Sequence, residues 1–181
     1  FFGGSYKYYD DFRAGDETDT VENSGYYEFG GDAKIQYRPF KHHELTVAAQ
    51  YWNQDSVPRT EQTRYAKPFH GSQVGQDFRN NNDQERALTY VRYRIGEIHG
   101  IIESAEVTLS YQNTKETLHR VRSNSGSNPN SGDRRTEKNG IDVDTFGAQA
   151  QFVSKTPIGT MTYGFDWYKD VVDSKRTENV F

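Results

Sequence analysis

Residues 27–37 read Tyr-Glu-Phe-Gly-Gly-Asp-Ala-Lys-Ile-Gln-Tyr, and side chains of two kinds alternate along them. The odd positions are all uncharged and mostly aromatic or aliphatic. The even positions carry glutamate, aspartate, lysine and glutamine, with one glycine. Successive side chains of a β-strand point to opposite faces. This segment therefore predicts a strand with one uncharged face and one polar face.

The same alternation recurs along the chain, clearly in four further segments and less cleanly in two. The clear segments are 45–51, 105–112, 146–152 and 161–167, and the weaker ones are 4–13 and 87–95. We therefore predict seven strands, at about residues 2–13, 25–38, 44–56, 84–96, 103–118, 140–154 and 160–171. No helix longer than one turn is expected. All five prolines are expected between strands, because proline lacks the N–H group that a sheet needs.

The predicted connections alternate between long and short. The long ones are 14–24, 57–83 and 119–139, and the short ones are 39–43, 97–102 and 155–159. In an up-and-down meander, successive connections leave from opposite ends of the sheet. All long loops are therefore expected at one end and all tight turns at the other.

Composition excludes several classes of protein. The 181 residues are 33% hydrophobic, with a mean hydropathy of -1.00, and no segment approaches the about 20 apolar residues of a membrane-spanning helix. An aromatic content of 14% is unlike a disordered chain. A net charge of -4 argues against nucleic-acid binding. Without cysteine, the chain has neither disulfides nor thiolate sites.

Long loops at one end and short turns at the other are typical of outer-membrane β-barrels. Their strands need about 9–11 residues to cross the bilayer, and Tyr and Trp collect at both interfaces. We expect one aromatic belt near the long loops, formed by Tyr27, Phe29, Tyr51, Tyr111, Phe165 and Trp167. A second belt near the short turns comprises Tyr37, Tyr93 and Phe152. The alternative is a soluble antiparallel β-sandwich, whose strands also alternate but whose apolar faces would favour Leu, Ile and Val.

Four segments resemble the β-barrel of TonB-dependent outer-membrane receptors. Residues 25–39 look like a strand entering a periplasmic turn, and 45–51 followed by 55–60 like the next strand running into an extracellular loop. Residues 83–90 are similar to the start of a descending strand, and 162–168 resemble the family's Tyr-Gly-hydrophobic-Asp strand. The resemblance implies an all-β fold, an antiparallel up-and-down meander of about seven strands that is part of a transmembrane β-barrel. Because family members have 22 strands and an N-terminal plug, residues 1–181 are expected to be an internal piece of the barrel domain.

The resemblance also implies a function. The expected protein is an active-uptake receptor in the outer membrane of a Gram-negative-type bacterium, importing a ferric siderophore, haem or cobalamin-type nutrient with energy from TonB. Its implied partners are outer-membrane lipid and lipopolysaccharide, its own plug domain, the TonB complex through that plug, and a small-molecule metal chelate. No reaction, cofactor or nucleic-acid partner is expected. The alternatives are a passive porin or channel and a soluble carbohydrate-binding β-sandwich.

The polar positions of the predicted strands should point into the barrel. They are Lys34, Gln36, Gln50, Arg92, Thr108, Ser110, Gln112, Gln149, Gln151, Thr162 and Asp166. In receptors of this family such residues hydrogen-bond the plug or line the route past it, and the resemblance implies that role here.

Loop residues are the candidates for ligand contact. They are Tyr65, His70, Arg120, Arg122, Arg134 and Arg135. Residues 113–139 hold six basic and three acidic side chains, which suit either an electropositive mouth or a solvated charged loop. The cluster His42-His43-Glu44 is expected to be a solvated turn and not a metal site, because adjacent side chains point apart. Asp10, Asp11, Asp142 and Asp144 are expected to be rim carboxylates, and no catalytic motif is found.

Overall fold

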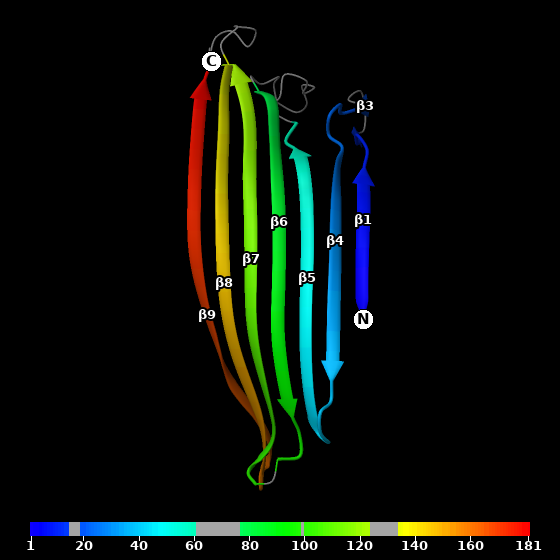
Figure 1. Ribbon diagram of the computed structural model, residues 1–181, viewed down its shortest axis with the longest axis vertical. Helices are drawn as coiled ribbons and strands as arrows, with labels where there is room; N and C mark the ends of the chain where they lie inside the picture. Colours follow the sequence, from blue (N-terminus) through cyan, green and yellow to red (C-terminus); the bar gives the residue numbers. More distant parts are fainter. Residues whose placement is uncertain (15–18, 61–76, 99, 124–133) are drawn as a thin grey trace.

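The computed structural model describes residues 1–14, 19–60, 77–98, 100–123 and 134–181 (Figure 1). Its main sheet has seven strands: β1 (Phe2–Tyr9), β4 (Tyr26–Tyr37), β5 (His43–Pro58), β6 (Asp77–Ile95), β7 (Ile102–Ser123), β8 (Arg134–Thr156) and β9 (Gly159–Val180). Two short strands, β2 (Arg13–Ala14) and β3 (Asp19–Thr20), pair with each other between β1 and β4. The described residues contain no helix that is long and apolar enough to cross a bilayer.

The seven strands form an antiparallel up-and-down meander, as the alternation predicted. Each of these seven strands pairs with the next of the seven along the chain, in the order β1-β4-β5-β6-β7-β8-β9. Figure 1 shows a gently curved, open sheet in which β1 and β9 are the edges and point the same way. β5, β7 and β9 begin at one end of the sheet, where the three short turns lie, and β4, β6 and β8 begin at the other, the long-loop end.

The strands at the long-loop end are longer than predicted. β6 begins at Asp77 and β9 continues to Val180, whereas the sequence predicted loops at 57–83 and 119–139 and a last strand that ended at 171. Polar composition suggested loops there, but cross-strand pairing continues through the polar residues. Pro58 is the last residue of β5 and not part of a connection, and the first strand ends at Tyr9 and not at residue 13.

The two faces of the sheet differ in polarity. One cross-strand ladder runs through Ile35, Val47, Val91, Leu109, Ala148 and Trp167. The next ladder, on the opposite face, runs through Gln36, Thr46, Arg92, Thr108, Gln149 and Asp166. We call the side of the first ladder the apolar face and the side of the second the polar face.

No second layer covers the apolar face within the described part of the chain. Ile35 is 69% exposed, Leu109 is 57% exposed and Val47 is 40% exposed. The only buried hydrophobic side chains among the described residues are those of Ala48 and Ala150. The described residues therefore do not form the β-sandwich that was the alternative fold, because a sandwich buries such faces against each other.

The segment between β1 and β4 is held by one carboxylate. Asp11 accepts backbone hydrogen bonds from Asn23 (3.1 Å), Ser24 (2.8 Å) and Gly25 (2.9 Å). The Gly25 N–H, together with those of Ser24 and Asn23, lowers the pKa of Asp11 below its usual range because each stabilises the charged form. Asp11 thus ties the start of β4 to the end of β1.

We expect this tie to be lost in acid. A carboxyl with a lowered folded-state pKa stabilises the fold above its unfolded pKa of about 3.9, and this contribution disappears as the pH falls through the folded value. Protection of the Asn23, Ser24 and Gly25 amides from hydrogen exchange, relative to their intrinsic exchange rates at each pH, should fall between about pH 5 and about pH 2. Asp11→Asn should show low protection at both pH values. Asp10→Asn is the matched control, because Asp10 accepts only from the Asp11 amide among the contacts observed; equal behaviour of the two variants would contradict the assignment.

Candidate functional site

The polar face gathers all eleven side chains that the sequence placed inside the barrel. Strand register puts them on this one side of the sheet, across β4 to β9. Several bond to the neighbouring strand: Arg92 Nε lies 3.3 Å from both Thr108 Oγ1 and Glu106 Oε1, and Arg86 Nε donates to Gln112 Oε1 at 2.9 Å. The polar face therefore presents mainly amide, hydroxyl and guanidinium groups, with apolar side chains such as Ala48 and Leu88 among them.

A charged cluster extends the polar face at the long-loop end. We call it the charged rim; its members are Asp77, Arg120, Arg122, Arg135, Glu137, Arg176 and Glu178. Arg120 Nε donates to Asp77 Oδ2 at 2.8 Å, and the Asp77 side chain is almost completely buried. Asp77, Arg176 and Glu178 lie outside the strands predicted from the sequence, so they were not among the predicted site residues.

Glu137 and Glu178 bring the other arginines of the charged rim together. Glu137 Oε1 lies 2.7 Å from Arg122 Nη2 and 3.2 Å from Arg135 Nε. Glu178 pairs with Arg135 and, at 3.1 Å, with Arg176. Arg135 lowers the pKa of the Glu178 carboxyl by hydrogen bonding and charge.

The structure corrects the position of the candidate ligand-binding arginines. Arg120, Arg122, Arg134 and Arg135 lie on β7 and β8 and not in a loop. Three of them have carboxylate partners in the charged rim, and the guanidinium of Arg134 lies 4.7 Å from the centroid of the Phe78 ring. The rim is thus closer to charge balance than the electropositive mouth that was one of the two interpretations of this segment. Tyr65 and His70 lie outside the described residues.

The His42-His43-Glu44 side chains have separate partners. His42 Nε2 lies 3.2 Å from Glu97 Oε2, and His43 Nδ1 lies 2.5 Å from Tyr93 Oη. Glu44 accepts two hydrogen bonds from Arg38, at 2.7 and 2.9 Å. The three side chains therefore have separate partners, and His43 and Glu44 are the first residues of β5 and not part of a turn. The described part of the chain contains no group of three or more metal-ligating side chains.

Tyrosine hydroxyls mark both borders of the apolar face. Toward the long loops, Tyr111 Oη donates to Asp144 Oδ1 at 2.6 Å, and Tyr27 Oη donates to Asp55. Toward the short turns, Tyr93 Oη lies 2.5 Å from His43 Nδ1, and Tyr163 Oη lies 3.2 Å from Ser154 Oγ. The aromatic rings thus lie on apolar surface while their polar ends reach hydrophilic partners. We call the zone between these borders the apolar belt.

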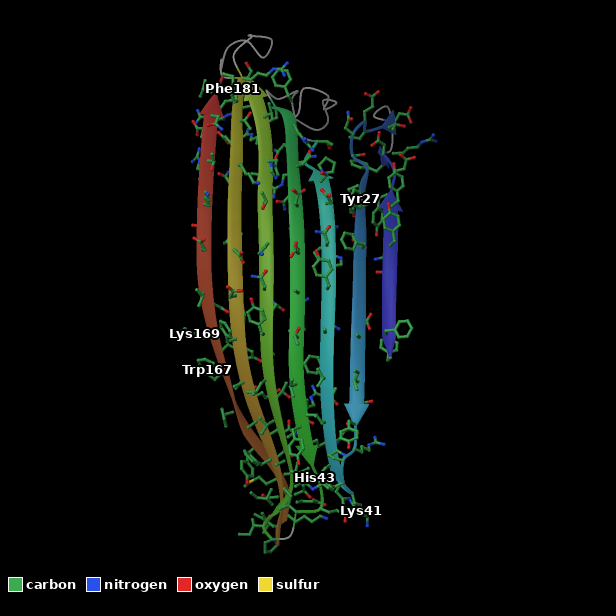
Figure 2. The ribbon with its side chains drawn as sticks, viewed as in Figure 1. Tyr27, Lys41, His43, Trp167, Lys169 and Phe181 are labelled. Atoms are coloured by element: carbon green, nitrogen blue, oxygen red, sulfur yellow. The ribbon has the colours of Figure 1, made fainter. Side chains whose placement is uncertain are left out.

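The apolar belt runs obliquely across the strands. The ladder that starts at Phe29 on β4 passes through Asn53, Glu85, Lys115 and Asp142 and reaches Asp173 on β9. An aromatic residue on β4 is therefore level with a charged residue on β9. Figure 2 shows the same descent, with Tyr27 nearer the long-loop end than Trp167.

Because the apolar belt is oblique, the aromatic residues are not arranged in the level belts that the sequence predicted. Tyr27, Tyr51, Tyr111 and Trp167 form a descending line and not a level row. Phe165 shares a ladder with Tyr93 and Tyr37, so it does not lie near the long-loop end. The sequence placed it there because the last strand was predicted to end nine residues too early, at 171 and not at Val180.

Searches with this sequence and structure identify no relative. No protein-family model, no curated protein and no solved structure matches the chain.

Proposed function

We propose that this sheet is part of the wall of an outer-membrane β-barrel, with the apolar face toward lipid and the polar face toward the lumen. The oblique apolar belt is the single observation that carries the proposal. On β9 the residue that is level with the start of the belt on β4 is Asp173, but the belt on β9 starts only at Trp167, about 20 Å closer to the short turns. This shift accumulates over the width of the sheet from β4 to β9, which is about 24 Å. The belt is thus inclined by about 40° to the perpendicular of the strands. Strands of a wall whose belt lay level with the bilayer would therefore tilt by about 40° from the membrane normal, within the about 35–45° tilt of membrane barrels.

The height of the apolar belt also supports this orientation. On β8 the belt occupies residues 145–153, between Asp144 and Ser154, which are the partners of Tyr111 and Tyr163. A tilted strand needs about 9–11 residues to cross the hydrocarbon core. Tyrosine hydroxyls at both borders suit the two membrane interfaces, where amphipathic rings collect.

The strands extend well beyond the apolar belt on one side only. β7 and β9 have 22 residues and β8 has 23, which corresponds to about 70 Å of extended chain. The excess lies at the long-loop end and carries the charged rim. In outer-membrane barrels the longer loops are extracellular, so we place the charged rim outside the cell.

We further propose that the complete protein is a TonB-dependent active-uptake receptor for a ferric siderophore, haem or cobalamin-type nutrient. The resemblance of residues 25–39, 45–51 followed by 55–60, 83–90 and 162–168 to that family supports this assignment. The polar face suits contact with a plug domain, because it presents hydrogen-bonding groups across six strands. Lipid, lipopolysaccharide, the plug and, through it, the TonB complex are the proposed partners.

A passive channel is the second candidate, because the same polar face would suit a water-filled lumen. Deleting the gene in the source bacterium separates the two. An uptake receptor predicts loss of growth on one supplied ferric siderophore, on haem or on cobalamin, with the same loss when TonB is inactivated. Growth loss that is independent of TonB would support the channel instead.

The membrane-wall proposal predicts that the complete protein needs a detergent or lipid to stay in solution. The expected result is a monodisperse peak in detergent by size-exclusion chromatography and aggregation when the detergent is removed. The physical reason is the uncovered apolar face, since soluble monomers rarely expose large contiguous apolar patches. A monodisperse peak in plain buffer would contradict membrane insertion.

A further inference from the structure

A polar pocket of about 370 Å³ lies at the long-loop end of the sheet. It is bordered by the segment that leads into β4, by the last residues of β5 and by the first residues of β6 (Figure 1). Pockets for small molecules have volumes of about 300–1,000 Å³, so this one suits a small ligand. The described residues that supply its chemistry are Glu22, Asn23, Ser56, Pro58, Phe78 and Arg79.

Two carboxylates hold the walls of the pocket in place. Asn23 and Ser56 have positive φ angles of 61° and 55°, which are uncommon for residues other than glycine. The Asn23 N–H donates to Asp11 Oδ2 at 3.1 Å. The Ser56 N–H donates to Asp83 Oδ1 at 2.8 Å. Backbone outliers of this kind cluster at ligand sites, and walls that are already fixed reduce the entropy lost on binding.

Glu22 and Arg79 bring one negative and one positive charge to the pocket. Neither forms an ion pair with the other or with any other described residue. Arg79 Nε donates to the Asn81 side-chain oxygen at 3.2 Å in the amide orientation that satisfies both groups, which leaves its two Nη groups for a ligand. Glu22 and Arg79 are both exposed, so a ligand that enters from solvent meets both charges.

The two charges favour a ligand that is itself a zwitterion. Asp55 acts electrostatically on Arg79. Its two oxygens already accept hydrogen bonds from Tyr27 Oη and Ser56 Oγ, so the open donors of Arg79 suit a ligand carboxylate. The Glu22 carboxylate suits an ammonium group. A neutral sugar would leave both charges unpaired, and an anion would leave Glu22 unpaired.

We propose that this pocket binds a free α-amino acid with an apolar side chain. Arg79 binds the carboxylate and Glu22 the ammonium group, while Pro58 and Phe78 contact the side chain. The guanidinium of Arg134, 4.7 Å from the centroid of the Phe78 ring, steadies that ring. The inference goes beyond the membrane wall and does not depend on it, because the binding residues belong neither to the apolar belt nor to the charged rim.

The first test uses the complete wild-type protein in detergent and isothermal titration calorimetry at neutral pH. The probes are L-leucine, 4-methylpentanoate, which lacks the ammonium group, 3-methylbutylamine, which lacks the carboxylate, and glucose. We expect L-leucine to bind and each single-charge analogue to bind at least about tenfold more weakly, because it loses a hydrogen bond to a charged group. Glucose should not bind.

Substitutions then assign each ligand charge to one side chain. Glu22→Gln should weaken the binding of L-leucine about tenfold and leave that of 4-methylpentanoate unchanged. Arg79→Gln should weaken L-leucine to a similar extent and leave 3-methylbutylamine unchanged. Glu97→Gln is the matched control, because Glu97 is an exposed glutamate between β6 and β7, at the short-turn end and outside the pocket. Its affinity for L-leucine should equal that of the wild type.

Absence of L-leucine binding overturns the proposal, as does equal affinity for the single-charge analogues or binding of glucose in place of L-leucine. Wild-type affinity in folded Glu22→Gln and Arg79→Gln overturns it as well. The comparison of ligands uses the wild type, so the proposal can be refuted even if a variant does not fold. None of these outcomes bears on the membrane-wall proposal, which detergent dependence tests separately.

Discussion

Leu109→Arg should destabilise the protein by about 2–4 kcal/mol in lipid vesicles, the cost of an arginine at the mid-plane of a barrel's lipid face. Leu109 lies within the apolar belt and is 57% exposed on the isolated sheet. If that exposed surface faced water, the same substitution would change stability by no more than about 0.5 kcal/mol. The variant therefore separates contact with lipid from contact with water.

Gln149→Arg is the matched control for this experiment. Gln149 lies on the neighbouring strand but on the polar face, between Thr108 and Asp166 in its ladder. An arginine at this position would lie beside the Asp166 carboxylate and not in hydrocarbon. We therefore expect the free energy of unfolding to change by no more than about 0.5 kcal/mol. Both variants are unfolded with denaturant in lipid vesicles, with heat-modifiable electrophoretic migration as the readout. Equal effects of the two substitutions would refute the assignment of faces.

Gly164→Ala should destabilise the pairing of β8 with β9 by about 1–3 kcal/mol, the range for overpacking a site that is already full. A Cβ atom at Gly164 would lie 2.1 Å from the carbonyl oxygen of Ala150. The obstacle is backbone, so it cannot move aside by rotating a side chain. The two strands must instead separate locally, with loss of hydrogen bonds in their ladder.

Gly140→Ala is the matched control on β8, since the nearest atom to its added Cβ is 3.9 Å away. This substitution should leave stability unchanged or raise it by up to about 1 kcal/mol, because alanine loses less conformational entropy than glycine. The readout is hydrogen exchange of the amides in β8 and β9, together with the thermal midpoint in detergent. Unchanged exchange in Gly164→Ala would show that the strands tolerate the extra methyl group.

The charged rim shows where sequence patterns are weakest. Polar and charged residues near Asp77 and Glu178 indicated loops, because a strand pattern normally needs alternating apolar positions. Their carboxylates instead pair with arginines from neighbouring strands, such as Arg120 and Arg135. Ion pairing between strands depends on register, which separate segments of sequence do not specify.

The sequence by itself determined the all-β class, the meander order and which side chains share a face. These follow from a local rule, the period of two between side chains on one face of a strand, and the segment from Tyr27 to Tyr37 was sufficient to apply it. The oblique course of the apolar belt was decided only by the tertiary structure. It depends on which residue of β4 stands opposite which residue of β9, and that offset accumulates through five successive cross-strand pairings. The same register sets the partners of the tyrosine hydroxyls, such as Asp144 for Tyr111, since each pair combines residues that are distant in sequence.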